Sequence, residues 1–343
     1  DKDMASEFVM MKTEVADELM SSNIYQEVIP NLESALVFAD EYTKGPVTNR
    51  LILCYLNTNK NARTVSFIDS IRIANNDNVI YSEQKAEALH KMNKSEEAIT
   101  ELEKAGRNNS ETYERISSEY IKRLNEQGAT GKAYAISKNW VEKAPQSQLG
   151  LIYAISTSDA LNKYNESDYY ISKGKTLYPE EPYFVIKEAA SMYRNKEYDA
   201  GMDTLRAWVE SYPKNNELVS SYSAHADMRA QELLKENKPD EALDIIKYAL
   251  ELDKTNQELL LTEGRAYEMK GDYKSAYNSY SKYSTETLWT KEYKQKLMNI
   301  QNKGYKNTIS TDILSGWYAN GNRPNTIISA AYLKRYWASH HPN

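Results

Sequence analysis

Four histidines and one cysteine are the nitrogen and sulfur ligands that this chain could offer to a zinc ion. The histidines, at positions 90, 225, 340 and 341, are too few and too scattered to give the regular ligand spacing of a zinc site. Only the adjacent pair His340 and His341 could hold an adventitious ion. Cys54 has no second cysteine with which to form an internal disulfide. The sequence therefore predicts no metal centre, no cofactor and a packed thiol.

Motifs for nucleophilic or phosphate chemistry are also missing. The chain contains no G-x-G-x-x-G, G-x-x-x-x-G-K-[ST], G-x-S-x-G or H-E-x-x-H segment. Carboxylate pairs such as Glu96 and Glu97 fall on polar positions of expected helices, where such charges are usually solvated. An enzyme would have to assemble its site without any recognisable motif, so we predict that the protein is not an enzyme.

A regular repeat, with a period of about 34 residues, organises the chain. The segment Trp140-Val-Glu-x-x-Pro145 returns two periods later as Trp208-Val-Glu-x-x-Pro213, and Pro179 lies halfway between the two prolines. A period this strict predicts tandem copies of one supersecondary unit.

The clearest copy lies between Thr255 and Lys282 and resembles the tetratricopeptide repeat (TPR), a helix-turn-helix unit with small residues where helices cross. The positions that carry the resemblance are Gly264, Tyr267, Gly271, Asp272, Tyr273, Ala276 and Tyr280. Ala242 stands one period before Ala276, but the interval from Gly201 to Ala242 is wider than one period. The wider interval predicts a first helix longer by about seven residues in that copy, or a looser turn.

The resemblance implies an all-α fold. It would be a right-handed α-α superhelix (TPR solenoid) of about eight helix-turn-helix repeats, with a short non-repeat C-terminal tail. Apolar residues keep helical spacing from Glu7 to Gln301 without an alternating segment. We therefore predict the superhelix over residues 1–290, a C-terminal capping helix over 291–303, and an aromatic, basic tail over 304–343.

In this family the first helices line a concave groove, which is the default binding surface. The residues that the resemblance places on or near the groove are Lys122, Tyr183, Tyr193, Arg194, Arg229 and Arg265. One specialised groove of the family binds a C-terminal carboxylate through lysines and asparagines. The equivalent positions here hold Thr13, Asp17, Asn49 and Leu53, so a chaperone-tail receptor is not predicted.

Net charge bears on the choice of partner. The chain carries −6 at pH 7, and the repeat region shows no concentrated basic face of the kind that binds phosphates. We therefore expect a protein or peptide partner and no nucleic acid. No run of about 18 apolar residues occurs, so no transmembrane helix is expected.

The tail from Tyr305 loses the helical period and is basic. Two segments, Thr308–Tyr318 and Thr326–Trp337, have the length and the β-branched or aromatic content of strands. The aromatic residues predicted to make interactions are Trp317, Tyr318, Tyr332 and Trp337. The tail is either a short hairpin or helix pair that covers the last repeat, or the first strands of a barrel.

A second resemblance concerns this tail. Lys306-Asn-x-Ile-x-x-Asp312 looks like the opening strands of the outer-membrane barrels that follow TPR arms in the YaiO family, as do Pro324, Ser329, Tyr332 and Arg335 after it. It covers about one tenth of the chain. Because such barrels need at least about eight strands, the resemblance implies that any barrel is missing from this chain.

Two functions remain open on this basis. The first is a non-catalytic protein-protein interaction scaffold that binds a peptide or partner protein in the concave groove. The second is the periplasmic TPR arm of an outer-membrane export or assembly system, joined to an envelope complex through the tail. The start at Asp1 fits a processed or trimmed chain. The compartment stays open, with periplasmic or outer-membrane association favoured over the cytoplasm.

Overall fold

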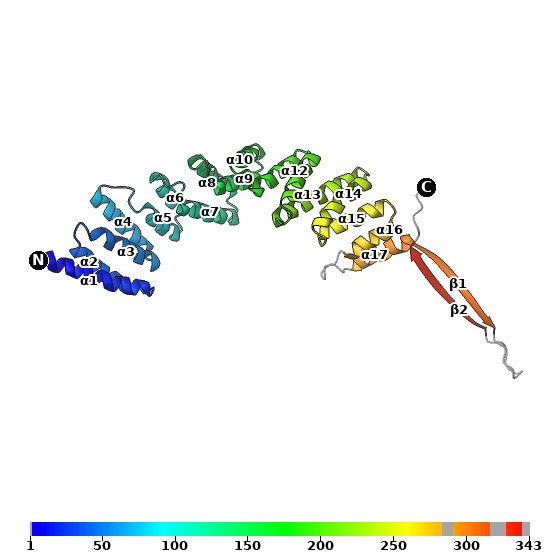
Figure 1. Cartoon of the computed structure of the whole chain (residues 1–343), viewed down its shortest axis with the longest axis horizontal. Helices are drawn as coiled ribbons and strands as arrows, with labels where there is room; N and C mark the ends of the chain where they lie inside the picture. The colour runs from blue at the N-terminus through cyan, green and yellow to red at the C-terminus, as the bar shows by residue number, and fades with distance from the viewer. Residues whose placement is uncertain (1, 283–290, 316–326, 338–343) are drawn as a thin grey trace, which may run out of the picture. The chain divides into compact units, whose positions relative to one another are not determined.

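The computed structural model describes residues 2–282, 291–315 and 327–337. The chain divides into two compact units, Asp1–Glu180 and Glu181–Asn343. Within each unit, consecutive helices pack against one another in pairs (Figure 1).

The described part of the first unit contains ten helices. Their bounds are α1 (Lys2–Ser21), α2 (Tyr25–Phe38), α3 (Lys44–Asn57), α4 (Asn61–Asn75), α5 (Ser82–Lys91), α6 (Ser95–Lys104), α7 (Glu111–Glu126), α8 (Thr130–Lys143), α9 (Gln148–Ala160) and α10 (Tyr164–Leu177). The second unit continues with α11 (Pro182–Arg194), α12 (Tyr198–Ser211), α13 (Asn216–Lys235), α14 (Pro239–Leu252), α15 (Gln257–Met269), α16 (Tyr273–Lys282), α17 (Lys291–Gly304), β1 (Tyr305–Ser315) and β2 (Ile327–Trp337).

The described helices form eight consecutive pairs, from α1 with α2 to α15 with α16, and α17 follows alone. The all-α fold class and the expected number of repeats are confirmed. First helices also contact one another within each unit: α3 with α5, α5 with α7 and α7 with α9, then α11 with α13 and α13 with α15. They form the layer that the resemblance assigned to the groove. Among the described residues, no helix combines the length and apolar character needed to cross a bilayer.

The turn inside each pair contains one residue in the left-handed backbone region. These residues, with φ between 55° and 75°, are Asn23, Asn59, Asn93, Gly128, Asn162, Lys196, Asn237 and Gly271. Glycine and asparagine tolerate this conformation better than other residues do, which accounts for seven of the eight positions. From Gly128 onward, one sequence period separates each such residue from the next, except for a wider interval between Lys196 and Asn237. The repeat is therefore visible in the backbone as well as in the sequence.

The wider interval has its cause in α13. This helix has 20 residues, seven more than the 13 of α11 and of α15. Seven residues advance a helix by nearly two turns, so its buried side stays in phase with its neighbours. Leu218, Tyr222, Ala226, Ala230 and Leu233 are accordingly all buried. The prediction of a longer helix is confirmed, and the looser turn is not needed.

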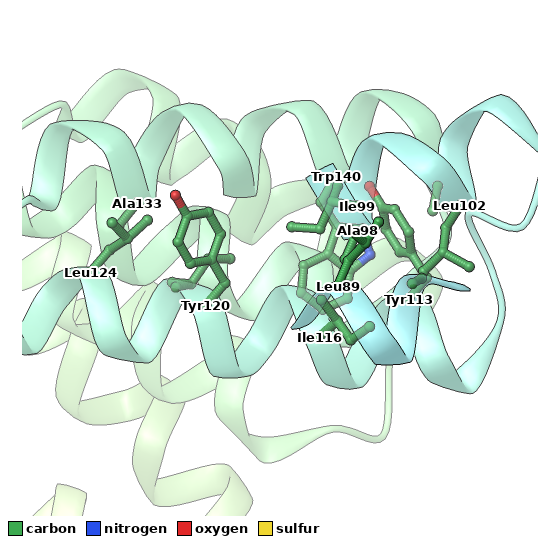
Figure 2. Packing of buried hydrophobic residues seen from close by; sticks show 13 residues of the cluster. Leu89, Ala98, Ile99, Leu102, Tyr113, Ile116, Tyr120, Leu124, Ala133 and Trp140 are labelled. Carbon is green, nitrogen blue, oxygen red and sulfur yellow. The ribbon is translucent and has the colours of Figure 1, made fainter. Parts of the chain in front are cut away.

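Small residues allow the helices to cross closely, as the sequence predicted. Ala242 and Ala276 are fully buried. A Cβ added to Gly264 would lie 2.5 Å from the ring of Tyr280, so α15 can approach α16 only with glycine at this position. In the first unit, Ala98 and Ala133 occupy matching places beside Tyr113, Tyr120 and Trp140 (Figure 2).

The tail forms a hairpin. β1 and β2 pair in antiparallel fashion, from Tyr305 opposite Trp337 to Ser315 opposite Ile327. Strands were predicted here, and β1 begins three residues earlier than Thr308, directly after α17. A helix pair, the other form considered, is excluded for these segments. The role of residues 291–303 as a cap remains a prediction, as does the barrel resemblance.

Candidate functional site

Two hollows adjoin on first helices of the second unit. One, of about 600 Å³, is lined by residues of α13, α15, α16 and α17. The other, of about 680 Å³, is lined by α15 and α17. Glu268 and Lys303 border both hollows, so the two form a single surface, which we name the α15 groove. Its lining residues are Gln231, Leu234, Lys235, Arg265, Glu268, Met269, Tyr273, Gln295, Lys296, Asn299, Ile300, Asn302 and Lys303.

The carboxylate of Glu268 lies at the centre of the α15 groove. It accepts a hydrogen bond from the hydroxyl of Tyr280 at 3.2 Å, and Lys303 Nζ lies 3.6 Å from its other oxygen. Tyr280 is fully buried, and its ring also fills the space beside Gly264. The close approach of α15 to α16 at Gly264 therefore fixes the position of the Glu268 carboxylate in the groove.

Two further cations lie near Glu268. The Lys296 ammonium lies 4.2 Å from the centroid of the Tyr280 ring. Burial lowers the pKa of Lys296; Glu268 offsets part of this effect, and the positive charge of Arg265 adds to it. Arg265 is exposed and forms no ion pair with any of the described residues. Among the described residues, the groove thus contains positive charge that Glu268 does not neutralise.

Apolar side chains line the other part of the α15 groove. Leu234 of α13 and Tyr273 of α16 are half-buried there, and Met269 of α15 is 46% exposed. Thioether and aromatic surfaces adapt to varied apolar partners, and methionine is common on surfaces that bind several ligands. The groove can accept an apolar side chain next to a negatively charged one.

Arg265 is the only one of the six sequence-predicted groove residues that lines this surface. Two others belong to a packed joint between α11, α12 and α13. The hydroxyl of Tyr193 donates to the carbonyl oxygen of His225 at 2.7 Å, and burial raises the pKa of Tyr193. Arg229 donates to Asp199 at 3.0 Å, and its side chain is only 12% exposed. Contacts between the three helices account for the positions of Tyr193 and Arg229. A role of these two residues in binding remains a prediction.

The remaining candidates are dispersed. Lys122 is exposed on α7 in the first unit, and Tyr183 and Arg194 are half-buried at the two ends of α11. Trp317 and Tyr318 lie outside the described residues. Tyr332 and Trp337 are placed on β2 by the backbone pairing alone.

Sequence reasoning did not identify Leu234, Met269, Lys296 and Lys303 as groove residues. Leu234 follows from the extension of α13, because a 13-residue helix that started at Asn216, with the length of α11 or α15, would end before it. Lys296 and Lys303 are seven residues apart on α17, which is the spacing of one helical face. These two signals were present in the sequence and could have pointed to the groove.

One set of side chains in the first unit resembles a nucleophile arrangement. His90 Nδ1 lies 2.9 Å from Ser95 Oγ, and His90 Nε2 lies 2.8 Å from Glu119 Oε2. Ser95 is 1% exposed, however, and its Oγ also accepts from Arg123 at 2.7 Å. A buried hydroxyl with these partners is closed to a substrate. The cluster therefore connects α5, α6 and α7.

Within the described ranges, no three His, Cys, Asp or Glu side chains converge as metal ligands. His340 and His341 fall outside those ranges. Cys54 is buried, as expected, and burial raises the pKa of its thiol to about 11. A further hollow of about 720 Å³ in the first unit is bordered by the α2–α3 loop, α4 and the segment before α5.

Comparison with known proteins identifies the repeat. Residues 233–284, from the end of α13 through α16, match the model of the tetratricopeptide repeat. The repeat type predicted from Gly264, Tyr267 and Ala276 is thereby confirmed for this segment. No curated protein matches the chain in sequence.

Several solved structures share part of the helical arrangement. PilF of Pseudomonas aeruginosa is 13% identical, with a TM-score of 0.43 over 55% of this chain and 86% of that chain. YrrB, reported as a TPR protein with an unusual peptide-binding site, is 15% identical, with a TM-score of 0.40 over 60% of this chain and 93% of its own. A TPR protein from Parabacteroides merdae is 13% identical, with a TM-score of 0.39 over 86% and 98%. Likenesses of this size do not bear on what this chain binds.

Proposed function

We propose that the protein is a non-catalytic interaction scaffold whose first helices bind a peptide or an extended segment of a partner protein. The observation that carries the proposal is the α15 groove, an open surface with apolar and charged side chains on α13, α15 and α17. The matched repeat segment supplies six of its thirteen lining residues. A scaffold role follows from repeat architecture only by analogy, so the groove is the specific support.

The open, elongated form of the α15 groove favours a peptide over a small molecule. Each hollow is within the size range of ligand sites, which is about 300–1,000 Å³, but small-molecule sites usually enclose most of their ligand. Here the two hollows adjoin along successive helices, and the side chains at their borders are largely exposed. A peptide in a groove is recognised by side chains spaced along it, which suits two adjoining hollows.

A displayed library of random twelve-residue peptides tests this function on the full chain. The library is selected against the wild-type protein and against the double variant Leu234→Trp/Met269→Trp, whose larger side chains fill the apolar end of the groove. We expect peptides to be enriched on the wild type and lost from the filled variant. The matched control is Lys247→Trp, which changes an exposed residue on α14.

Equal enrichment on the filled variant would mean that peptides bind elsewhere. No enrichment on the wild type would remove the scaffold proposal for this groove. Circular dichroism of the filled variant, compared with the wild type, establishes that it has kept its helices before either result is interpreted.

A further inference from the structure

The α15 groove has a charge opposite to that of the chain. Four basic side chains line it, Lys235, Arg265, Lys296 and Lys303, and Glu268 is its acidic side chain. The described lining residues thus carry a net charge of +3, whereas the whole chain carries −6 at pH 7. Positive charge gathered on one surface of an acidic protein favours an anionic partner at that surface.

Existing ion pairs neutralise only part of this charge. Lys235 pairs with Glu232 at 2.6 Å, and Lys303 lies beside Glu268 at 3.6 Å. Arg265 and Lys296 form no ion pair with any of the described residues. The Lys296 ammonium is half-buried above the Tyr280 ring, where its own hydration is reduced. An incoming carboxylate would therefore meet two cations that form no ion pair with a carboxylate of the described residues.

The apolar lining limits which anion fits. Leu234, Met269 and Tyr273 occupy the end of the groove that also contains Arg265. A free phosphate or a nucleic-acid backbone would leave these side chains uncovered. A leucine-sized side chain flanked by aspartates or glutamates would cover them and would place carboxylates toward Arg265, Lys296 and Lys303.

The extension of α13 provides one wall of this surface. A helix of 13 residues starting at Asn216 would end at Met228, as α11 and α15 have that length. Gln231, Leu234 and Lys235, which border the groove, belong to the seven additional residues. The repeat whose first helix is longer than the others therefore provides part of the α15 groove.

We propose that the α15 groove binds an acidic peptide segment with an apolar side chain between its carboxylates. The apolar side chain packs against Leu234, Met269 and Tyr273, and the carboxylates pair with Arg265 and Lys296. This inference rests on the proposed scaffold function and specifies the chemical class of its ligand.

The peptides enriched from the random library on the full-length protein serve as the probe. We expect Asp and Glu on both sides of a Leu, Ile, Met or Phe. The most enriched peptide is then labelled with rhodamine, and its dissociation constant is measured by fluorescence anisotropy. A matched peptide carries Asn and Gln in place of Asp and Glu, and we expect it to bind at least about tenfold more weakly.

Variants of the protein test which positive charges bind the acidic peptide. Arg265→Gln/Lys296→Gln should weaken binding of the acidic peptide at least about tenfold, because both lost charges face the ligand. Lys247→Gln removes one exposed charge on α14 and should change the affinity less than about twofold. Raising the salt concentration should weaken binding to the wild type more than binding to the Gln variant.

The outcomes separate this inference from the function on which it rests. If neutral peptides are enriched, are lost on filling the groove, and bind Arg265→Gln/Lys296→Gln equally well, the acidic-ligand proposal is overturned while the scaffold function stands. If a twelve-nucleotide oligothymidylate displaces the acidic peptide as well as an unlabelled copy does, the groove responds to charge alone and the proposal is likewise overturned. If no peptide distinguishes the wild type from the filled variant, both proposals fail.

Discussion

The two copies of the Trp-Val-Glu-x-x-Pro segment, one in each unit, differ in how their tryptophans pack. Trp140 is 0% exposed, and Tyr113 lies edge-on to its ring (Figure 2). Tyr153 stacks on the same ring. Trp208 is half-buried and lies beside Tyr212. The same local sequence on the same kind of helix thus gives a core residue in one unit and a partly exposed residue in the other.

The difference in tryptophan burial arises from the residue that lies ten positions after each tryptophan. Gly150 follows Trp140, and a Cβ at that position would lie 3.2 Å from the indole. Leu218 follows Trp208 at the same distance in sequence and is itself fully buried. Glycine leaves room for the indole of Trp140, and we infer that the buried leucine takes the equivalent room beside Trp208. A motif therefore fixes the helix on which a residue lies, and the next helix decides how deeply that residue is buried.

The largest expected effect comes from removing the two tryptophans separately. Trp140→Ala should destabilise the protein by about 3–5 kcal/mol, because it leaves a large cavity among Tyr113, Tyr153 and Gly150. Trp208→Ala should cost only about 1–2 kcal/mol, because its side chain is already partly exposed to solvent. Urea unfolding followed by circular dichroism measures both. Equal losses for the two variants would contradict the comparison.

A second test gives the Trp140 site the leucine that stands at the equivalent position after Trp208. Gly150→Leu should displace the Trp140 indole and destabilise the protein by about 1–3 kcal/mol through overpacking. The indole should also become accessible to acrylamide, a change that the same variant on a Trp140→Phe background should not show. If quenching by acrylamide stays at the wild-type level, Gly150 is not what makes room for Trp140.

The sequence predicted the elements of this molecule better than their side-chain environments. The repeat period predicted the small residues Gly264 and Ala276 and the longer α13. Helices that cross closely restrict the size of the side chains at the crossing and the spacing of those residues along the sequence. The environment of Tyr193 and Arg229 did not follow. Their partners, His225 and Asp199, lie in other helices of the sequence, and only the packed helices show that they meet.

The α15 groove was predicted only through Arg265 for a related reason. Leu234, Lys296 and Lys303 come from segments whose positions depend on the additional turns of α13 and on α17. A single family pattern assigns groove positions within a regular repeat. It does not assign them where a helix is longer than the pattern, and that is where the described groove lies.

The two units also differ in their ion pairs, which gives a pH prediction. In the first unit Glu101 is buried and pairs with Arg72 at 2.7 Å, whereas in the second the carboxylate of Asp199, beside Arg229, is 79% exposed. Burial alone would raise the pKa of Glu101. The hydrogen bond and charge of Arg72, with Lys85 and Ser82, outweigh it, so the pKa lies below its usual 4.5.

A lowered pKa in the folded state stabilises the protein above pH 4.5, and this contribution is lost as the pH falls through the folded-state pKa. Wild-type stability should therefore fall more steeply below about pH 4.5 than that of Glu101→Gln, which cannot titrate there. Asp199→Asn is the control and should keep the wild-type slope, since exposed pairs contribute little. Thermal melts at a series of pH values compare the three slopes, and parallel curves for wild type and Glu101→Gln would refute the assignment.

The smallest effect concerns two matching turns, one in each unit. Asn162 and Lys196 are one repeat period apart, and both have a positive φ, 56° and 64°. A lysine is strained in this conformation, whereas asparagine is tolerated. Lys196→Asn should therefore stabilise the protein by about 0.5–1 kcal/mol, and Asn162→Lys should destabilise it by a similar amount. Urea midpoints of the two single variants and of the double variant test this symmetry: the two changes should cancel in the double variant, because they lie in separate turns. A loss of stability in Lys196→Asn would show that the lysine side chain contributes more through its contacts than its backbone conformation costs.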